Sequence, residues 1–368
     1  MSGTPDSSRP LVFAHREQDA ATVDGLRVHR VAREEREERG IAPGATRAVG
    51  AGSRLRPEEP DRYRTCFERD RDRVLHSAAF RRLAGKTQVF VHPEDHQRTR
   101  LTHALEVAQI ATAIGRSTGL NAELLDAMAL AHDIGHGPAG HTSETALEEY
   151  VPGFHHATWG ADVVLGPLNL CRETLDGVRC HSWSLPGPST PEGHVLSWAD
   201  RIAYCTHDFE DAAGAGVVSP SQLPAEVAEI AGRTRGQQVD TFLTALVDGI
   251  LEHGMVAMPE APASALRTLR SFNYERIYMR PASVAQGRAV VSVLRALVDY
   301  FAADPSRVPS DNEPELDPLL RSVAYVAGMT DRFAFRSAVE LLGWPVDKLP
   351  MGIDSPYAGL GPAAAATP

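Results

Sequence analysis

The stretch from Ala131 to Glu144 constrains the fold of this 368-residue chain more than any other. It contains five side chains of the kind that bind metals: His132, Asp133, His136, His141 and Glu144. Three glycines and a proline stand between them. Imidazoles and carboxylates bind divalent cations, and glycine lets the backbone bend so that adjacent residues can face one ion. Two neighbouring ligands do not make a metal site, so the fold has to bring further ligands from other segments.

Helical periodicity indicates where those ligands lie. His103 is followed by apolar residues at offsets of four, seven and eleven, so it shares the buried face of its helix. His132 continues the apolar stripe of the run before it, and Asp200 stands in the apolar helical segment 195–204. An ionised carboxylate on such a helix is costly unless it is paired or bound to a metal.

Each of these residues alone has an ordinary explanation, because a histidine on an apolar helix face is usually a hydrogen-bonded core residue. Their joint occurrence on faces that should be buried favours a metal site with four ligands: His103, His132, Asp133 and Asp200. Two imidazoles and two carboxylates suit Mg, Mn or another first-row transition metal. We therefore expect a divalent metal ion as cofactor.

The rest of the chain predicts an all-α protein, because helical periodicity recurs and we find no repeat, no strand-type alternation of useful length and no glycine-rich phosphate loop. Gly119 is expected to end the helix that carries His103. Helices are expected in the segments 33–39, 61–120, 124–132, 142–150, 195–204, 224–254, 266–278, 284–301 and 320–342, and a loop in 171–193. The expected organisation is a disordered extension (1–31), one compact helical domain (32–345) with an irregular segment at 41–60 and a metal-binding core at about 64–215, and a C-terminal tail (346–368).

A metal that serves in hydrolysis would also need a proton donor beside it, because a metal alone does not expel an alkoxide leaving group. His141 and Glu144 lie three residues apart at the start of a helix that Thr142 or Ser143 can cap. The helix dipole favours the carboxylate there. His141 oriented by Glu144 therefore fits the role of proton donor, with His136 close by.

The formal net charge of -11 means that the molecule as a whole does not attract polyanions. If the protein binds a phosphate group, the binding site must therefore be a local concentration of basic side chains. Eight basic residues fall between Arg69 and Arg100, and most are expected on solvated helix faces, paired with neighbouring carboxylates. Arg100 is the exception, because it precedes His103 by one turn and its guanidinium can grip phosphate near the metal.

No apolar run is long enough to cross a bilayer, and the polar start is not a signal peptide, so we expect a cytoplasmic location and no membrane partner. The four cysteines form no metal-type spacing. Reduced, structural thiols are expected.

The pattern His…His-Asp…Asp resembles that of the HD superfamily of metal-dependent phosphohydrolases. Longer strings resemble the deoxyguanosinetriphosphate triphosphohydrolase-like proteins, a branch of that superfamily, over most of the chain from about residue 33 to 344. These strings are Arg69–Ser77, Phe80–Leu83, Lys86–Phe90, Arg98–His103 and Ala327–Arg332.

The resemblance implies hydrolysis of a deoxynucleoside triphosphate to deoxynucleoside and inorganic triphosphate, with dGTP or several dNTPs as substrate. It implies that His141 and Glu144 are the catalytic pair and that His136 and His156 line the same pocket. It further implies that phosphates contact Arg100, Arg201, Arg276 and Tyr278, and that Tyr204 and Asp208 lie against the sugar. Arg54 and Arg56 are additional candidates for phosphate contacts, because this segment packs near the nucleotide in relatives.

Members of the family form homo-oligomers, from dimers to hexamers, and respond to dNTP effectors, so both properties are expected by analogy. Three positions depart from the common pattern: Ala139 replaces an aromatic residue, Gln97 replaces a tyrosine, and Arg201 replaces the glutamate of many bacterial members. Ala139 and Gln97 are expected to border the pocket, so the departures leave the preferred base open.

Two alternatives remain at this point. The chain could be an HD phosphohydrolase for another nucleotide, such as a deoxynucleoside monophosphate or a modified nucleotide. It could also be a module that senses nucleotides and binds single-stranded nucleic acid. The acid–base pair of His141 and Glu144 favours an enzyme, because a pure sensor has no need for it.

Overall fold

The computed structural model describes residues 10–91, 97–309 and 316–352. Across these ranges the chain is helical and has no strand; two isolated bridges, Arg54 with Cys171 and Thr87 with Thr99, are its only β-type pairings. The all-α prediction is confirmed. The α-helices are α1 (Arg30–Gly40), α2 (Cys66–His76), α3 (Ala78–Arg82), α4 (Arg100–Thr118), α5 (Ala122–Ala131), α6 (His141–Leu147), α7 (His156–Trp159), α8 (Arg172–Cys180), α9 (Pro191–Gly214), α10 (Ala225–Ile230), α11 (Arg235–His253), α12 (Glu260–Asn273), α13 (Pro281–Ala303), α14 (Pro318–Ala327) and α15 (Asp331–Leu342).

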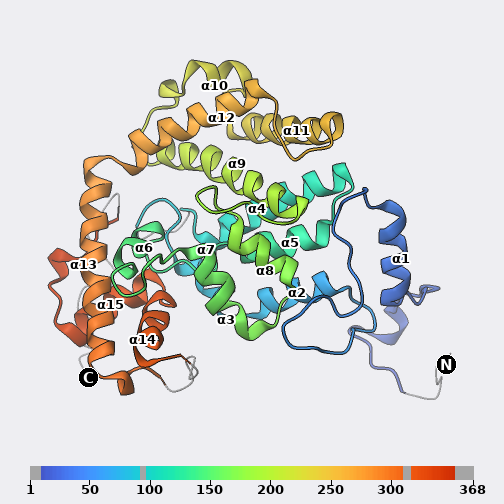
Figure 1. Cartoon of the computed structure of the whole chain (residues 1–368), viewed down its shortest axis with the longest axis horizontal. Helices are drawn as coiled ribbons and strands as arrows, with labels where there is room; N and C mark the ends of the chain where they lie inside the picture. The colour runs from blue at the N-terminus through green and yellow to red at the C-terminus, as the bar shows by residue number, and fades with distance from the viewer. Residues whose placement is uncertain (1–9, 92–96, 310–315, 353–368) are drawn as a thin grey trace.

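Helix α5 lies at the centre of the larger hydrophobic core and packs against α2, α4, α8 and α9 (Figure 1). Gly119 ends α4 in the left-handed conformation, with φ of 72°, as predicted. Asn121 then caps α5 by accepting a hydrogen bond from the Leu124 amide at 3.1 Å. Leu124, Leu125 and Met128 are fully buried, so the end of α5 is fixed in the interior. This placement delivers the residues that follow α5 to the middle of the molecule.

A second hydrophobic core forms where the long helix α13 packs against α6, α14 and α15 (Figure 1). Val290, Val293, Leu294 and Leu297 supply one fully buried stripe of α13. Their helical spacing matches the amphipathic helix that the sequence predicted for 284–301. Because α6 begins with His141, this second core positions the other side of the site.

Three expectations about helices were wrong. The segment 171–193 is not one loop, because α8 occupies its first half and the closely spaced prolines come only after it. The segment 320–342 forms two helices, α14 and α15. Helix α6 begins at His141 with Gly140 before it, rather than with a Thr142 or Ser143 cap. Ser143 is used otherwise: its hydroxyl donates to the Gly140 carbonyl and accepts from the Gly137 amide, which ties the glycine-rich loop to the helix.

The charged segment predicted near residues 33–39 is indeed a helix, α1, and the segment 41–60 is irregular. Buried Glu192 anchors that segment by accepting hydrogen bonds from the Thr46 amide at 3.0 Å and the Thr46 hydroxyl at 2.7 Å. Most of the predicted C-terminal tail, from residue 353 onward, lies outside the described residues. None of the helices in the described part of the chain is long and apolar enough to cross a membrane.

Candidate metal centre and active-site cavity

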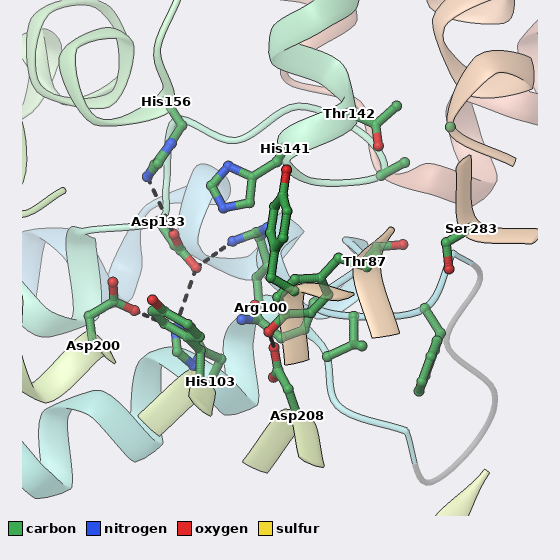
Figure 2. Close-up of a pocket in the computed structure, with 18 of the residues that line it drawn as sticks. Thr87, Arg100, His103, Asp133, His141, Thr142, His156, Asp200, Asp208 and Ser283 are labelled. Atoms are coloured by element: carbon green, nitrogen blue, oxygen red, sulfur yellow. Dashed lines mark hydrogen bonds and ion pairs between the residues drawn. The ribbon is translucent and has the colours of Figure 1, made fainter. Parts of the chain in front are cut away.

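The structure brings the four predicted metal ligands together from α4, from α9 and from the turn after α5, and Figure 2 labels His103, Asp133 and Asp200 among them. His103 comes from α4, His132 and Asp133 follow α5, and Asp200 comes from α9. His103 Nε2 lies 3.0 Å from Asp200 Oδ1 and 3.9 Å from Asp133 Oδ2, and His132 Nε2 lies 3.7 Å from Asp200 Oδ1. The helical phases read from the sequence therefore converge on one point.

The hydrogen bond of His132 leaves one ring nitrogen free for a metal ion. Its Nδ1 lies 2.7 Å from the Ala129 carbonyl oxygen, which can only accept, so Nδ1 carries the proton. The buried Nε2 then presents a lone pair, and it has no hydrogen-bond partner among the described residues. An imidazole held through one nitrogen with a bare second nitrogen is the usual form of a metal-bound histidine. The residues present therefore fit a divalent cation.

The two carboxylates are ionised. Burial alone would raise the pKa of Asp133, but Arg100 and His132 outweigh it and hold that pKa well below its ordinary value. Burial alone would also raise the pKa of Asp200, but the hydrogen bond from His103 and the nearby His132 outweigh it. The pKa of Asp200 is therefore below its ordinary value. Negative charge is thus available where a cation would bind.

Arg100 was expected to hold phosphate, and in the structure its guanidinium donates to Asp133 Oδ2 at 2.6 Å. The side chain is buried and lines the cavity described below. A Cβ at Gly140 would lie 2.5 Å from Arg100 Nη2, and Gly140 has a positive φ of 64°. Glycine is therefore required at this position for two reasons, the backbone conformation and the close approach of Arg100.

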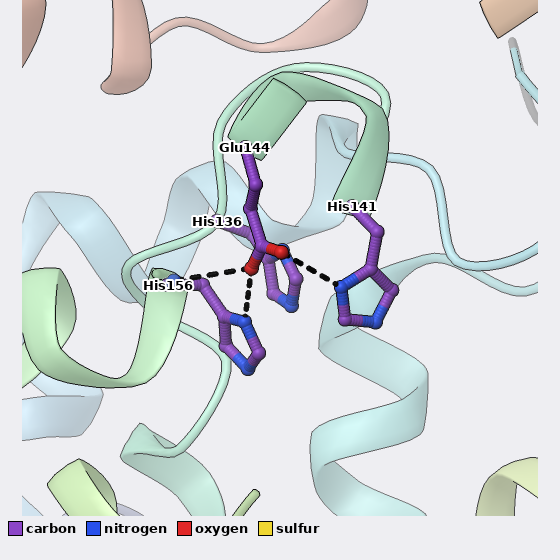
Figure 3. Close-up of side chains that lie close together, drawn as sticks. All are labelled: His136, His141, Glu144 and His156. Atoms are coloured by element: carbon purple, nitrogen blue, oxygen red, sulfur yellow. Dashed lines mark hydrogen bonds and ion pairs between the residues drawn. The ribbon is translucent and has the colours of Figure 1, made fainter. Parts of the chain in front are cut away.

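Next to the metal ligands, Glu144 joins two histidines (Figure 3). One oxygen of Glu144 accepts from both the amide and the Nδ1 of His156, and the other lies 3.5 Å from Nδ1 of His141. Burial alone would raise the pKa of Glu144, but the hydrogen bonds from His141 and His156 outweigh it and hold that pKa far below the ordinary value. The side chain of His141 is 71% exposed, so it can meet a bound molecule.

His136 and His156 are neutral rings buried beside this pair. The rings stack with centroids 3.7 Å apart, and His136 Nε2 lies 3.1 Å from Asp133 Oδ1. Burial, with Arg100 and His156 nearby, lowers the pKa of His136 well below its ordinary value. Burial also lowers the pKa of His156 to about 3. The structure thus brings together all four residues placed in the catalytic region by the sequence.

His181 belongs to the same cluster and was missed by the sequence analysis, which assigned its segment to a loop. It follows α8, is buried, and its Nε2 lies 3.2 Å from Nε2 of His156. Its ring is perpendicular to that of His132, with centroids 5.0 Å apart. Burial lowers the pKa of His181 to about 4.

A cavity of about 790 Å³ opens onto these groups. Of the predicted substrate contacts, Arg100, His156, Arg201, Tyr204, Asp208 and Tyr278 line it. Arg276 does not: its side chain is exposed and lies outside the cavity. Arg270 and Arg280, which the sequence analysis did not select, line the wall instead. The π-helical turn Tyr274–Tyr278 shifts the register of side chains here, which helical spacing alone does not reveal.

The cavity wall is organised by its own contacts. The guanidinium of Arg201 stacks on the Trp183 ring at 3.2 Å, a cation–π contact. Arg270 donates to the Tyr204 hydroxyl at 3.0 Å, and the Tyr278 hydroxyl donates to Asp208. Burial raises the pKa of Asp208 to about 6.

The expectation that most basic residues between Arg69 and Arg100 lie on solvated faces was wrong for Arg98 and Lys86. Arg98 is buried among Asp208, Asp211 and Glu106. Lys86 is buried and donates to the carbonyls of His136 and Ala327, and burial lowers its pKa to about 7. Arg98 thus holds Asp208 of the cavity wall, and Lys86 holds the backbone of the loop that carries His136.

Arg54 and Arg56 do not reach the cavity. Arg54 is buried against Asp70 and also donates to the Cys66 carbonyl, while Arg56 donates to the Pro167 carbonyl at 2.9 Å. Their role as phosphate contacts is therefore not supported, because other partners occupy them. Of the two departures expected at the pocket, Ala139 lines the cavity and Gln97 does not.

Comparison with known proteins agrees with this geometry. Residues 100–205 match the HD domain, and residues 256–340 match the phosphohydrolase-associated domain. The first match spans the four predicted metal ligands, and the second covers α12, α13, α14 and most of α15. The fold and the site thus define an HD-domain phosphohydrolase, a class that binds divalent metals.

Curated relatives narrow the class. A deoxyguanosinetriphosphate triphosphohydrolase-like protein from Caldanaerobacter subterraneus subsp. tengcongensis is 39% identical over 319 residues, which cover 84% of this chain and 94% of the relative. One from Clostridium tetani is 37% identical over 314 residues, covering 80% and 90%. The chain belongs to the family of deoxyguanosinetriphosphate triphosphohydrolase-like proteins. Among solved structures, a hypothetical protein from Aquifex aeolicus aligns with a TM-score of 0.45 and 19% identity over 74% of this chain and 71% of that one.

Proposed function

We propose that this protein hydrolyses deoxynucleoside triphosphates to deoxynucleoside and inorganic triphosphate. The observation that carries the proposal is the cavity of about 790 Å³, which joins the His/Asp cluster to a wall of arginines and tyrosines. This volume lies in the range of pockets that enclose small ligands, roughly 300–1,000 Å³. The relatives named above, which are deoxyguanosinetriphosphate triphosphohydrolase-like proteins, support the same substrate class.

In the proposed reaction, water adds to the α-phosphorus and the bond from that phosphorus to the 5′-oxygen breaks. The leaving 5′-oxygen needs a proton, and His141 is the exposed imidazole at the cavity. Glu144 faces Nδ1 of His141 and so leaves Nε2 as the nitrogen that can pass a proton. A partly buried, ionised Glu144 fixes the orientation of this imidazole.

The cofactor in this proposal is a divalent cation held by His103, His132, Asp133 and Asp200. When bound, it would neutralise charge on the phosphate and lower the pKa of the attacking water. Its chemical identity among Mg, Mn and other first-row metals is left to the measurement.

The remaining groups would bind and orient the substrate. Arg201 and Arg270 present positive charge to phosphates, and Trp183 holds the guanidinium of Arg201 in place. Asp208 lines the cavity and is held by Arg98 and Tyr278, and in this proposal it would accept from the 3′-hydroxyl of the sugar. Tyr204 beside it would occupy the space of a 2′-hydroxyl, which gives a physical reason for preferring deoxyribose.

The test is to incubate the metal-loaded protein with each dNTP, singly and in mixtures, and to separate the products by chromatography. Release of deoxynucleoside and intact triphosphate supports the proposal and identifies the preferred base. Activity that requires a mixture would indicate an effector nucleotide, and size-exclusion chromatography with light scattering on the same samples would report the oligomer.

Two controls make the test specific. Asp133→Ala removes a metal ligand and should abolish turnover, whereas Arg276→Ala changes an exposed arginine outside the cavity and should leave turnover unchanged. Absence of triphosphate under every condition would contradict the proposal. Product from a deoxynucleoside monophosphate instead would support the alternative substrate.

A further inference from the structure

Two of the four free cysteines, Cys66 and Cys171, meet in the interior although they are far apart in the sequence. Cys66 is the first residue of α2, Cys171 directly precedes α8, and both side chains are buried. A Cβ on Gly52 would lie 2.3 Å from Sγ of Cys171 and 3.3 Å from Sγ of Cys66, so both sulfurs lie against one backbone position. The fold thus brings together two thiols that no sequence spacing connects.

Arg54 and Asp70 hold the two cysteines in place. Arg54 Nη2 donates to the Cys66 carbonyl at 2.9 Å, and the backbone of Arg54 forms an isolated bridge with Cys171. Asp70 accepts from the Cys171 amide at 2.8 Å and from Arg54 Nη1 at 2.5 Å. Both side chains are buried with the thiols. The positions of the two sulfurs relative to each other are therefore fixed by their surroundings.

The two thiols differ in acidity. A hydrogen bond from the Cys171 thiol lowers the pKa of Cys66, and the Arg54 guanidinium acts in the same direction against burial. The same hydrogen bond, together with burial, raises the pKa of Cys171. A thiolate is the reactive form of cysteine, and a helix N-terminus with a nearby arginine favours it. Cys66 is thus the sulfur suited to attack, and Cys171 is the one suited to react second.

We propose that Cys66 and Cys171 are a redox modification site, which hydrogen peroxide converts into an intramolecular disulfide. The Cys66 thiolate attacks one oxygen of the peroxide, so the O–O bond breaks, hydroxide leaves and a sulfenic acid forms. The sulfur of Cys171 then displaces the sulfenic oxygen, which leaves as water with the proton of the Cys171 thiol. Two electrons move from the sulfurs to the peroxide, and one S–S bond forms.

The segment that covers the pair is thin. Gly52 lies directly over both sulfurs, and its neighbours Val49, with 70% of its surface exposed, and Ser53 are open to solvent. Irregular surface segments open at a lower free energy than packed helices, which gives a small oxidant access to the thiols. The disulfide would join the starts of α2 and α8, and both of these helices pack against α5 (Figure 1).

The test counts free thiols in the folded full-length protein before and after treatment with hydrogen peroxide. It needs no substrate, so its result is independent of the proposed reaction. The protein is unfolded in an alkylating reagent, and mass spectrometry counts the alkylated cysteines. The reduced protein should carry four. After peroxide about two should remain, with the peptides of Cys66 and Cys171 linked, and dithiothreitol should restore the others.

Substitutions separate the roles of the two sulfurs. Cys171→Ser keeps a hydroxyl that can donate to Cys66, and its oxidation should stop at the Cys66 sulfenic acid, which dimedone labels. Cys66→Ser should keep all its remaining thiols. The matched control is Cys205→Ser, since Cys205 is also buried but belongs to α9, and this variant should form the disulfide as the wild type does. Circular dichroism would confirm that each variant is folded.

Two results would overturn the proposal. Four alkylated cysteines in the peroxide-treated wild type would mean that the pair is inert. A disulfide that involves Cys180 or Cys205, that joins two chains, or that still forms in Cys66→Ser or Cys171→Ser would place the oxidation elsewhere.

Discussion

Removing the guanidinium of Arg98 should strongly destabilise the protein, because three carboxylates lose the partner that they share. The side chain is 9% exposed and serves three carboxylates at once. Its Nε lies 2.9 Å from Asp211, its Nη1 lies 3.1 Å from Glu106, and its Nη2 donates to Asp208. Arg98→Met keeps most of the apolar stem and removes only the charge and the donors, so it isolates the electrostatic contribution.

The size of the loss in unfolding free energy depends on the carboxylates that Arg98→Met leaves unpaired. Breaking a buried pair by removing one partner costs about 3–5 kcal/mol, because the other charge stays buried and uncompensated. Three carboxylates remain here, so we expect a loss near the upper end of that range. The control is Arg64→Met, because Arg64 pairs with Asp61 and Asp72 on the surface with 49% of its side chain exposed. Exposed pairs contribute about 0–1 kcal/mol.

The loss should depend on pH. Burial raises the pKa of Glu106 to about 7 and that of Asp208 to about 6 in the folded protein, while Arg98 lowers both. Without Arg98 both pKa values rise further. A carboxyl group whose folded pKa exceeds its unfolded pKa binds more protons when folded, so its stabilising contribution is present at acid pH and is lost as the pH rises through the folded pKa. The free-energy loss in Arg98→Met should therefore be smaller at pH 5 than at pH 8.

Urea denaturation of both variants and the wild type, followed by circular dichroism at the two pH values, measures these differences. A loss in Arg98→Met no larger than that in Arg64→Met would refute the reasoning. So would an equal loss at both pH values, because it would mean that the carboxylates find other compensation.

Three further predictions concern the site. Glu144→Gln should lower kcat of the proposed reaction about 10²–10⁴-fold with metal content unchanged, because it removes the charge that supports His141; steady-state kinetics with metal analysis checks this, and unaltered kcat would count against the pair. Gly135→Ala should cost about 1–3 kcal/mol, because its Cβ would lie 2.1 Å from the His156 carbonyl oxygen and 2.5 Å from the Gly160 amide nitrogen; urea denaturation measures it, and a change near zero would contradict the close packing. Stripping the metal should lower Tm, and Mn²⁺ at about 100 times Kd should restore about 2.7 kcal/mol; a Tm indifferent to chelator would argue against a bound cation.

Three of the predicted metal ligands, His103, His132 and Asp200, could be selected from the sequence because each one continues a local helical stripe, and Asp133 because it follows His132 directly. His103 shares a face with Val107 and Ile110, and all three are buried as the spacing predicted. His181 carries the same kind of signal, since Thr174 and Val178 precede it at offsets of seven and three and both are buried. The closely spaced Pro186, Pro188 and Pro191 made the whole segment look irregular, although α8 ends before the first of them. The helical periodicity of residues 172–180 is thus independent of the prolines that follow in the same segment.

The burial of Arg98 could not be predicted in this way. Its partners Asp208 and Asp211 lie 110 and 113 residues away, and no local pattern connects them. Only the crossing of α4 and α9 decides which arginine is buried.

A longer connection shows why the predicted metal-binding core at 64–215 does not contain everything that positions the site. Asp331, at the start of α15, accepts from the Thr87 amide at 3.1 Å, from the Thr87 hydroxyl, and from the Ala139 amide at 2.8 Å. Ala139 has a positive φ of 59°, which is unfavourable for a residue with a Cβ and needs such support. Lys86 adds a second tie between the carbonyls of His136 and Ala327. The loop that leads from the metal ligands to His141 is thus held in place by the region that matches the phosphohydrolase-associated domain.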